Sequence, residues 1–159
     1  MLPPAFPFTG RNRRPPRDPV NALLSFGYVL AGTEIQSLLD GLGFDPFFGF
    51  FHQIEYGRPS LALDLLEEFR APLIDRFTLR LLNLGLLREA DFGSDPESGV
   101  RLKKESLARF FELYQRELTT PIKVDGEELS YRHLFRRQAE RLGRALTEGL
   151  PYEPFRLPS

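Results

Sequence analysis

Apolar residues recur every three or four positions along most of this 159-residue chain, and this spacing constrains the fold more than any other feature. It is typical of amphipathic helices and differs from the strict alternation of a half-buried strand. The clearest stripes lie in residues 20–31, 107–118 and 131–146. We therefore predict an all-α fold, a single helical domain of about five to seven helices.

Prolines and glycines set the expected boundaries. Residues 1–19 are crowded with prolines and arginines, which favours an extended N-terminal arm ahead of a helical domain over residues 20–159. Asp18 is placed to cap a helix that has Pro19 at its first position. A capping-box pattern that starts at Thr33 predicts a second helix, ending at the glycines 41 and 43.

Further along, Pro72 is expected to break or kink a helix that continues to about residue 87. Turn residues predict one or two short hairpins, near residues 91–102 and 122–130, the second around Asp125-Gly126. A last amphipathic helix is expected from about Ser130 to Glu148.

Composition narrows the class of protein. The net charge is -1, so any nucleic-acid binding must come from local patches, and arginine dominates the 21 basic residues. There is no cysteine, which excludes disulfides and thiolate metal sites. We expect no apolar run to reach the length of a membrane span, and hence a soluble, cytoplasmic protein that does not bind membranes.

Residues 49–70 carry the candidate site. Ser60 is placed to cap a short helix on which Asp64, Glu67 and Glu68 share one face, while the opposite face is apolar. His52 lies twelve residues before Asp64. Carboxylates with a histidine suit a divalent metal ion, but acidic residues on a helix also form ordinary solvated faces.

The segment between residues 44 and 59 is rich in aromatic side chains. Two interpretations remain open. The rings could stack on nucleic-acid bases, or they could pack the loop onto the helical core.

Three sequence blocks together point to a known family. They are Gly10–Ser25 (GRNRRPPRDPVNALLS), Phe44–Pro46 leading to His52, and Gly57–Arg70 (GRPSLALDLLEEFR). In this order they resemble the CRISPR-associated adaptation integrase, the catalytic subunit of the spacer-acquisition complex. Weaker similarity continues to the C-terminus.

The resemblance implies an endonuclease and integrase that uses Mg²⁺ or Mn²⁺. Such a protein transfers captured prespacer DNA into the leader–repeat boundary of a CRISPR array. The implied partners are that DNA, the small second Cas protein of the adaptation complex, and a second copy of the integrase.

Carried over residue by residue, the resemblance assigns His52, Asp64 and Glu67 as metal ligands and catalytic residues, and leaves Glu68 open. Candidate phosphate contacts flank these positions in the sequence, namely Arg11, Arg13, Arg14 and Arg58. Asn21 is expected to be structural, linking the arm to the helices.

One departure from the family matters. The family has a further metal-binding glutamate upstream of the Gly10 block and an N-terminal β-rich dimerisation domain, and neither is found before Gly10. The expectation is therefore a C-terminal catalytic portion with low activity by itself. The alternative is a non-catalytic helical module that binds DNA or protein and retains the motif as scaffold.

Overall fold

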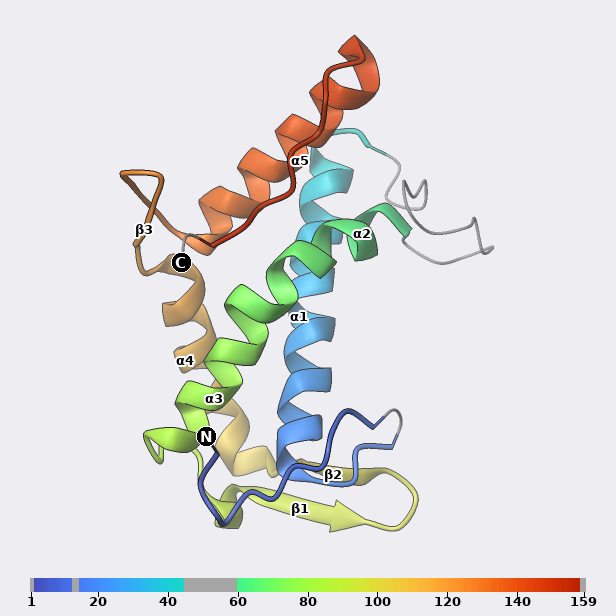
Figure 1. Ribbon diagram of the computed structural model, residues 1–159. Coiled ribbons are helices and arrows are strands. Elements are labelled where there is room, and N and C mark those ends of the chain that lie inside the picture. The colour runs from blue at the N-terminus through green and yellow to red at the C-terminus, as the bar shows by residue number, and fades with distance from the viewer. Residues whose placement is uncertain (1, 13–14, 45–59, 158–159) are drawn as a thin grey trace. The chain divides into compact units, whose positions relative to one another are not determined.

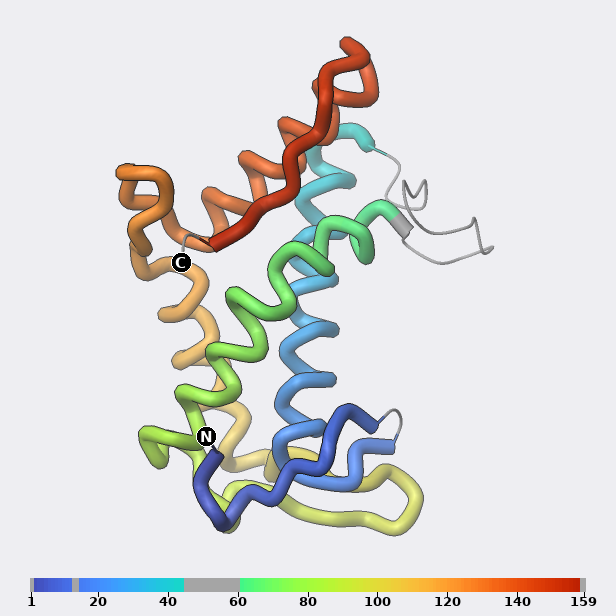
Figure 2. The backbone as a smooth tube through the Cα atoms, viewed as in Figure 1, coloured from blue at the N-terminus to red at the C-terminus, as the bar shows by residue number. Residues whose placement is uncertain are grey.

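The computed structural model describes residues 2–12, 15–44 and 60–157. It is predominantly helical, with two small antiparallel strand pairs (Figures 1 and 2). The elements in chain order are α1 (Pro19–Gly41), α2 (Ser60–Phe69), the π-helical turn η1 (Arg70–Asp75), α3 (Arg76–Asn83), the 3-10 turn η2 (Glu89–Asp91), β1 (Phe92–Asp95), β2 (Gly99–Leu102), α4 (Lys104–Thr119), β3 (Ile122–Val124), β4 (Glu127–Leu129) and α5 (Tyr131–Glu148).

Both predicted hairpins are confirmed. Strand β1 pairs with β2, and β3 pairs with β4, each as an isolated two-stranded sheet within the described residues. Asp125 and Gly126 connect the second pair with φ angles of 51° and 86°, the left-handed conformation that tight hairpin turns require. The chain is thus mostly helical rather than strictly all-α.

The predicted helix boundary at Thr33 is wrong, because α1 runs without interruption from Pro19 to Gly41. The Thr33 hydroxyl does not cap a new helix but donates to the Val29 carbonyl, 2.9 Å away and one turn earlier. Ala31 and Ile35, on either side of the expected break, are fully buried. Their packing favours a continuous helix over the local capping pattern.

Helix α1 is also long and apolar enough to cross a membrane by length and composition alone, with a mean hydropathy of 1.3. The expectation that no apolar stretch reaches that length is therefore wrong. Val20, Leu23 and Leu39 on this helix are buried inside the protein. Packing against the rest of the chain accounts for part of its apolar composition.

Pro72 does not end the helix in which it lies. Helix α2 continues through the six-residue π-helical turn η1 into α3. Proline lacks an N–H group and its ring crowds the carbonyl four residues earlier, so the wider turn accommodates it. The Pro72 carbonyl accepts a hydrogen bond from the Tyr131 hydroxyl at 2.5 Å.

The chain divides into two compact units. Unit 1 comprises Met1–Tyr28 and Ile74–Glu117, and unit 2 comprises Val29–Leu73 and Leu118–Ser159. Phe6 in the N-terminal segment is buried in unit 1, with its ring 6.1 Å from that of Phe92. The predicted division of the chain at residue 19 stays a prediction.

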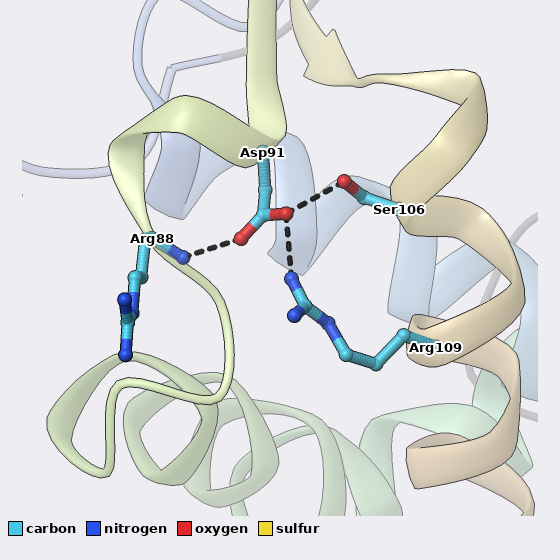
Figure 3. Close-up of polar contacts among 4 residues, drawn as sticks. All are labelled: Arg88, Asp91, Ser106 and Arg109. Carbon is cyan, nitrogen blue, oxygen red and sulfur yellow. Dashed lines mark hydrogen bonds and ion pairs between the residues drawn. The ribbon is translucent and has the colours of Figure 1, made fainter.

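A half-buried carboxylate organises one end of unit 1 (Figure 3). Asp91 accepts hydrogen bonds from the backbone N–H of Arg88 at 2.7 Å, the Ser106 hydroxyl at 2.7 Å and the Arg109 guanidinium at 2.5 Å. Burial alone would raise the pKa of Asp91, but these donors and the positive charge of Arg109 lower it below its ordinary value of 3.8. Asp91 thereby ties η2 to the first turns of α4.

The Asp91→Asn variant should therefore be less stable than the wild type at neutral pH, by on the order of 1–2 kcal/mol. Because the folded-state pKa is lowered, the stabilisation is fully present above about pH 3.8 and is lost as the pH falls through the folded pKa. Urea unfolding across a pH series measures this. The difference between the two proteins should be constant from pH 7 to 5 and shrink below about pH 4. A difference independent of pH down to full protonation would contradict this account of Asp91.

Candidate functional site

Helix α2 presents the predicted apolar face to the core of unit 2. Leu61, Leu65, Leu66 and Phe69 are all buried, as their helical spacing indicated. The helix begins at Ser60, the residue that the sequence placed at its start. The carboxylates of α2 are therefore attached to a packed element of the core.

The three carboxylates of α2 lie in different environments. Asp64 is buried, with only 8% of its surface exposed. The Glu67 side chain is 54% exposed and pairs with Arg70, the two charged groups being 2.6 Å apart. Glu68 is half-buried and faces other parts of unit 2. The three carboxylates, which the sequence placed on one face of the helix, therefore differ in their exposure and in their surroundings.

Glu68 is held by the C-terminal part of the chain. One carboxylate oxygen accepts from the Gln138 side-chain amide at 2.9 Å and from the Phe155 backbone N–H at 2.7 Å. The other accepts from the Tyr152 hydroxyl. Burial, together with this hydrogen bond and the Glu68 charge, raises the pKa of Tyr152 well above its ordinary value, so the phenol remains a donor.

Sequence reasoning missed these partners of Glu68. Gln138 lies on α5 between Leu134 and Leu142, at a position where the helical stripe is otherwise apolar. It is fully buried, and a polar residue at such a position must find hydrogen-bond partners. The polar Gln138 within an apolar stripe was the one sequence signal of a buried hydrogen-bond partner at this position. Nothing in the sequence indicated which carboxylate Gln138 would bind.

Four of the seven candidate site residues lie outside the described residues, namely Arg13, Arg14, His52 and Arg58, and so does the aromatic segment 45–59. Among the residues that are described, no three His, Cys, Asp or Glu side chains form a group that could hold a metal ion. Asp64, Glu67 and Glu68 therefore do not make a metal site by themselves. The predicted set of His52, Asp64 and Glu67 stays a prediction.

The donor chemistry of α2 nevertheless fits a divalent cation. Asp64 offers a hard oxygen ligand that is largely shielded from water, and Glu67 offers a second one turn further along the same helix. Shielding strengthens the attraction between a carboxylate and a cation. Glu67 would have to release or share its contact with Arg70 to bind the ion.

Asn21 has the linking role that the sequence suggested. The buried Asn21 side chain accepts from the Arg11 guanidinium at 2.9 Å and from the Asn12 N–H at 3.0 Å. It donates to the Gly10 carbonyl at 3.0 Å and to Asp18 at 2.7 Å. Asp18 also caps α1 by accepting from the Asn21 N–H at 2.8 Å, which confirms that prediction.

Arg11 is accordingly a structural residue in part. Its guanidinium binds Asn21 and lies over the Tyr28 ring, 5.2 Å from the ring centroid. The residue as a whole remains exposed, and a guanidinium has five N–H donors, more than its contacts with Asn21 use. Arg11 stays a candidate DNA contact.

Comparison with known proteins identifies the family. Residues 1–116 match the family described as CRISPR associated protein Cas1. The chain is 45% identical over 158 residues to a CRISPR-associated endonuclease Cas1 of Thermus thermophilus, covering 98% of this chain and 47% of that protein. The chain spans about half the length of this relative.

Solved structures agree with this result. A Cas1 protein from Thermotoga maritima superimposes with a TM-score of 0.81 at 30% identity, over 93% of this chain and 46% of that one. A chain of a Cas6-RT-Cas1–Cas2 complex gives a TM-score of 0.81 at 27% identity, over 97% of this chain and 17% of that one. The chain therefore belongs to the CRISPR-associated Cas1 family.

Proposed function

We propose that this chain carries the metal-dependent DNA endonuclease and strand-transfer centre of a Cas1 integrase. The observation that carries the proposal is the buried Asp64 on a core helix, in a chain 45% identical to a Cas1 endonuclease. The reaction would insert captured prespacer DNA at the leader–repeat boundary of a CRISPR array, in the cytoplasm.

His52, Asp64 and Glu67 would hold Mg²⁺ or Mn²⁺. A bound divalent cation supplies charge neutralisation at the phosphate and activation of the attacking and leaving oxygens. The protein's own contribution is placement. Asp64 is attached to α2, whose apolar face is buried, so its position is set by the packing of unit 2. Arg58 and the arginines of the N-terminal arm would bind and orient the DNA backbone.

The proposed partners are DNA, a second Cas1 subunit and the small Cas2 protein. The Cas6-RT-Cas1–Cas2 complex is named for an assembly of this kind. The chain spans about half of its relatives, so these partners are proposed for the protein by its family membership.

One observation favours a second candidate function, a non-catalytic DNA- or protein-binding module. Both carboxylate oxygens of Glu68, one of the three acids of α2, accept hydrogen bonds from the protein itself. In that case the motif around Asp64 would serve as scaffold.

A strand-transfer assay on branched DNA separates the two functions. Because this chain is expected to have low activity by itself, the assay adds in trans the part of the Thermus thermophilus relative that the chain does not match. The integrase should then join and cleave DNA in Mn²⁺ or Mg²⁺, and should stop when EDTA removes the metal. DNA binding that is undiminished by EDTA and accompanied by no reaction in either metal would instead support the binding module.

DNA binding should be electrostatic and independent of sequence. The Arg13→Ala/Arg14→Ala double variant should bind unrelated duplexes more weakly by similar factors. The slope of log affinity against log salt should also flatten by roughly 0.9 for each phosphate that the variant no longer neutralises. The matched control is Arg136→Ala/Arg144→Ala, which removes the same charge from exposed positions of α5. Weaker binding confined to one DNA sequence would contradict this prediction.

A further inference from the structure

The C-terminal segment, residues 150–157, runs back along α5 within unit 2 (Figures 1 and 2). It has no regular secondary structure and is joined to α5 by Gly149, whose φ of 67° allows the chain to reverse. Gln138 on α5 donates to the Glu153 carbonyl of this segment at 3.0 Å. The segment is therefore fixed to α5 by a buried amide.

This segment also contacts two adjacent residues in the last turn of α2, Glu68 and Phe69. Glu68 receives hydrogen bonds from Tyr152 and from the Phe155 N–H, and a third from Gln138. The Phe155 ring stacks on the ring of Phe69, with 5.1 Å between centroids and 16° between planes. One contact is polar and the other apolar, and they act on neighbouring positions of the helix.

We propose that the C-terminal segment positions the catalytic carboxylate of α2, with Glu68 as the positioning residue on which it acts. The inference rests on the proposed metal-dependent function of Asp64. Asp64 and Glu68 are one helical turn apart on the same side of α2. Holding Glu68 and Phe69 therefore restrains rotation of α2 about its axis and fixes the direction in which Asp64 projects.

A restraint on the rotation of α2 matters because catalysis requires the carboxylate to be placed precisely. The outer atoms of a helix lie roughly 5–6 Å from its axis, so a rotation of about 10° moves a carboxylate by about 1 Å. A misplacement of that size can reduce a reaction rate roughly a hundredfold. Glu68 and Phe69 lie four and five residues after Asp64 on the same helix, so restraints on them act on the part of α2 that carries Asp64.

Glu68 could instead be a metal ligand, since it is acidic and lies beside Asp64. Its contacts oppose that role, because both carboxylate oxygens already accept hydrogen bonds from the protein. The two roles make different demands on the side chain. A ligand needs the negative charge, whereas a positioning residue needs an acceptor oxygen of the right length for Gln138 and the Phe155 N–H.

Mn²⁺ binding, measured by electron paramagnetic resonance of the free ion, separates these roles. Glu68→Ala should weaken binding tenfold or more, as the loss of supporting residues around a metal ligand does. Glu68→Gln should stay within about threefold of wild type, because it keeps an oxygen for two of the three donors. Tyr152→Phe should lie between them. Glu148→Ala, at an exposed position of α5, is the control and should bind as wild type does.

Hydrogen exchange of the α2 amides gives a second readout, independent of metal. Exchange should accelerate in Tyr152→Phe and more so in Glu68→Ala, while amides of α3 in unit 1 remain unchanged. If Glu68→Ala does not fold, the Tyr152→Phe exchange and the Glu68→Gln affinity decide the question.

Two results would overturn the positioning role. In the first, Glu68→Gln binds Mn²⁺ as weakly as Glu68→Ala does, while Tyr152→Phe binds it as tightly as the wild type. That result would mean that Glu68 is a metal ligand. In the second, α2 exchange and Mn²⁺ affinity are unchanged in every variant. Asp64→Ala, measured alongside, identifies a failure of the proposed function itself. Mn²⁺ binding that does not depend on Asp64 would contradict both the proposed function and the positioning role. Binding that depends on Asp64 but is unchanged in the Glu68 and Tyr152 variants would contradict the positioning role alone.

Discussion

Replacing Asp64 by asparagine should lower metal-dependent strand transfer at least about a hundredfold. The substitution keeps the size of the side chain but removes its negative charge, so the packing of α2 changes little while the cation loses a charged oxygen ligand. The charge matters more at this buried position than at the surface, because less water screens it. DNA binding without metal should be almost unaffected.

The measurement is strand transfer on branched DNA in Mn²⁺, with the unmatched part of the Thermus thermophilus relative added in trans and at protein concentrations that saturate the substrate. Asp40→Asn is the matched control, since it makes the same change at an exposed position of α1 that is also in unit 2. Equal activity of Asp64→Asn and wild type would show that Asp64 is not a ligand. Thermal unfolding of both variants guards against a loss of activity caused by misfolding.

Replacing Phe69 by alanine should lower the free energy of unfolding by about 3–5 kcal/mol. The Phe69 ring is fully buried. It stacks on Phe155 and meets the edge of Phe135, with 4.6 Å between centroids and 81° between planes in the second pair. Alanine would leave a cavity bordered by the rings of Phe135 and Phe155. It would also remove the two aromatic ring interactions of Phe69, each of which contributes about 0.5–1.5 kcal/mol.

Urea unfolding followed by circular dichroism measures this decrease in stability. Phe8→Ala is the control, because the Phe8 side chain in unit 1 is 38% exposed and its removal should cost well under half as much. A cost below about 1 kcal/mol for Phe69→Ala would mean that the surrounding side chains collapse into the space. In that case α2 is held less firmly than its contacts indicate.

Local sequence patterns predicted much of this structure. The buried face of α2, the Asp18 cap and the Asp125-Gly126 turn each depend on residues a few positions apart, so they could be recognised without the fold. The break at Thr33 was wrongly predicted, because a local capping signal was outweighed by burial of Ala31 and Ile35.

The contacts of Glu68 could not be predicted, since its partners Gln138 and Phe155 are 70 and 87 residues away in the chain. From its residue type alone, Glu68 could be expected to be either a metal ligand or an acidic side chain exposed to solvent. Only the fold shows that the C-terminal segment reaches this carboxylate, and hence that two neighbouring acids of α2, Glu67 and Glu68, have different surroundings.

The hydrogen bonds of Asn21 also limit how this family member can diverge. A primary amide can donate two hydrogen bonds and accept two, and Asn21 makes all four, to Gly10, Arg11, Asn12 and Asp18. Aspartate could not donate to the Gly10 carbonyl and would repel Asp18, while glutamine would be one methylene too long for the buried space. Positions 18 and 21 should therefore vary together across relatives, as a covarying pair, rather than one at a time.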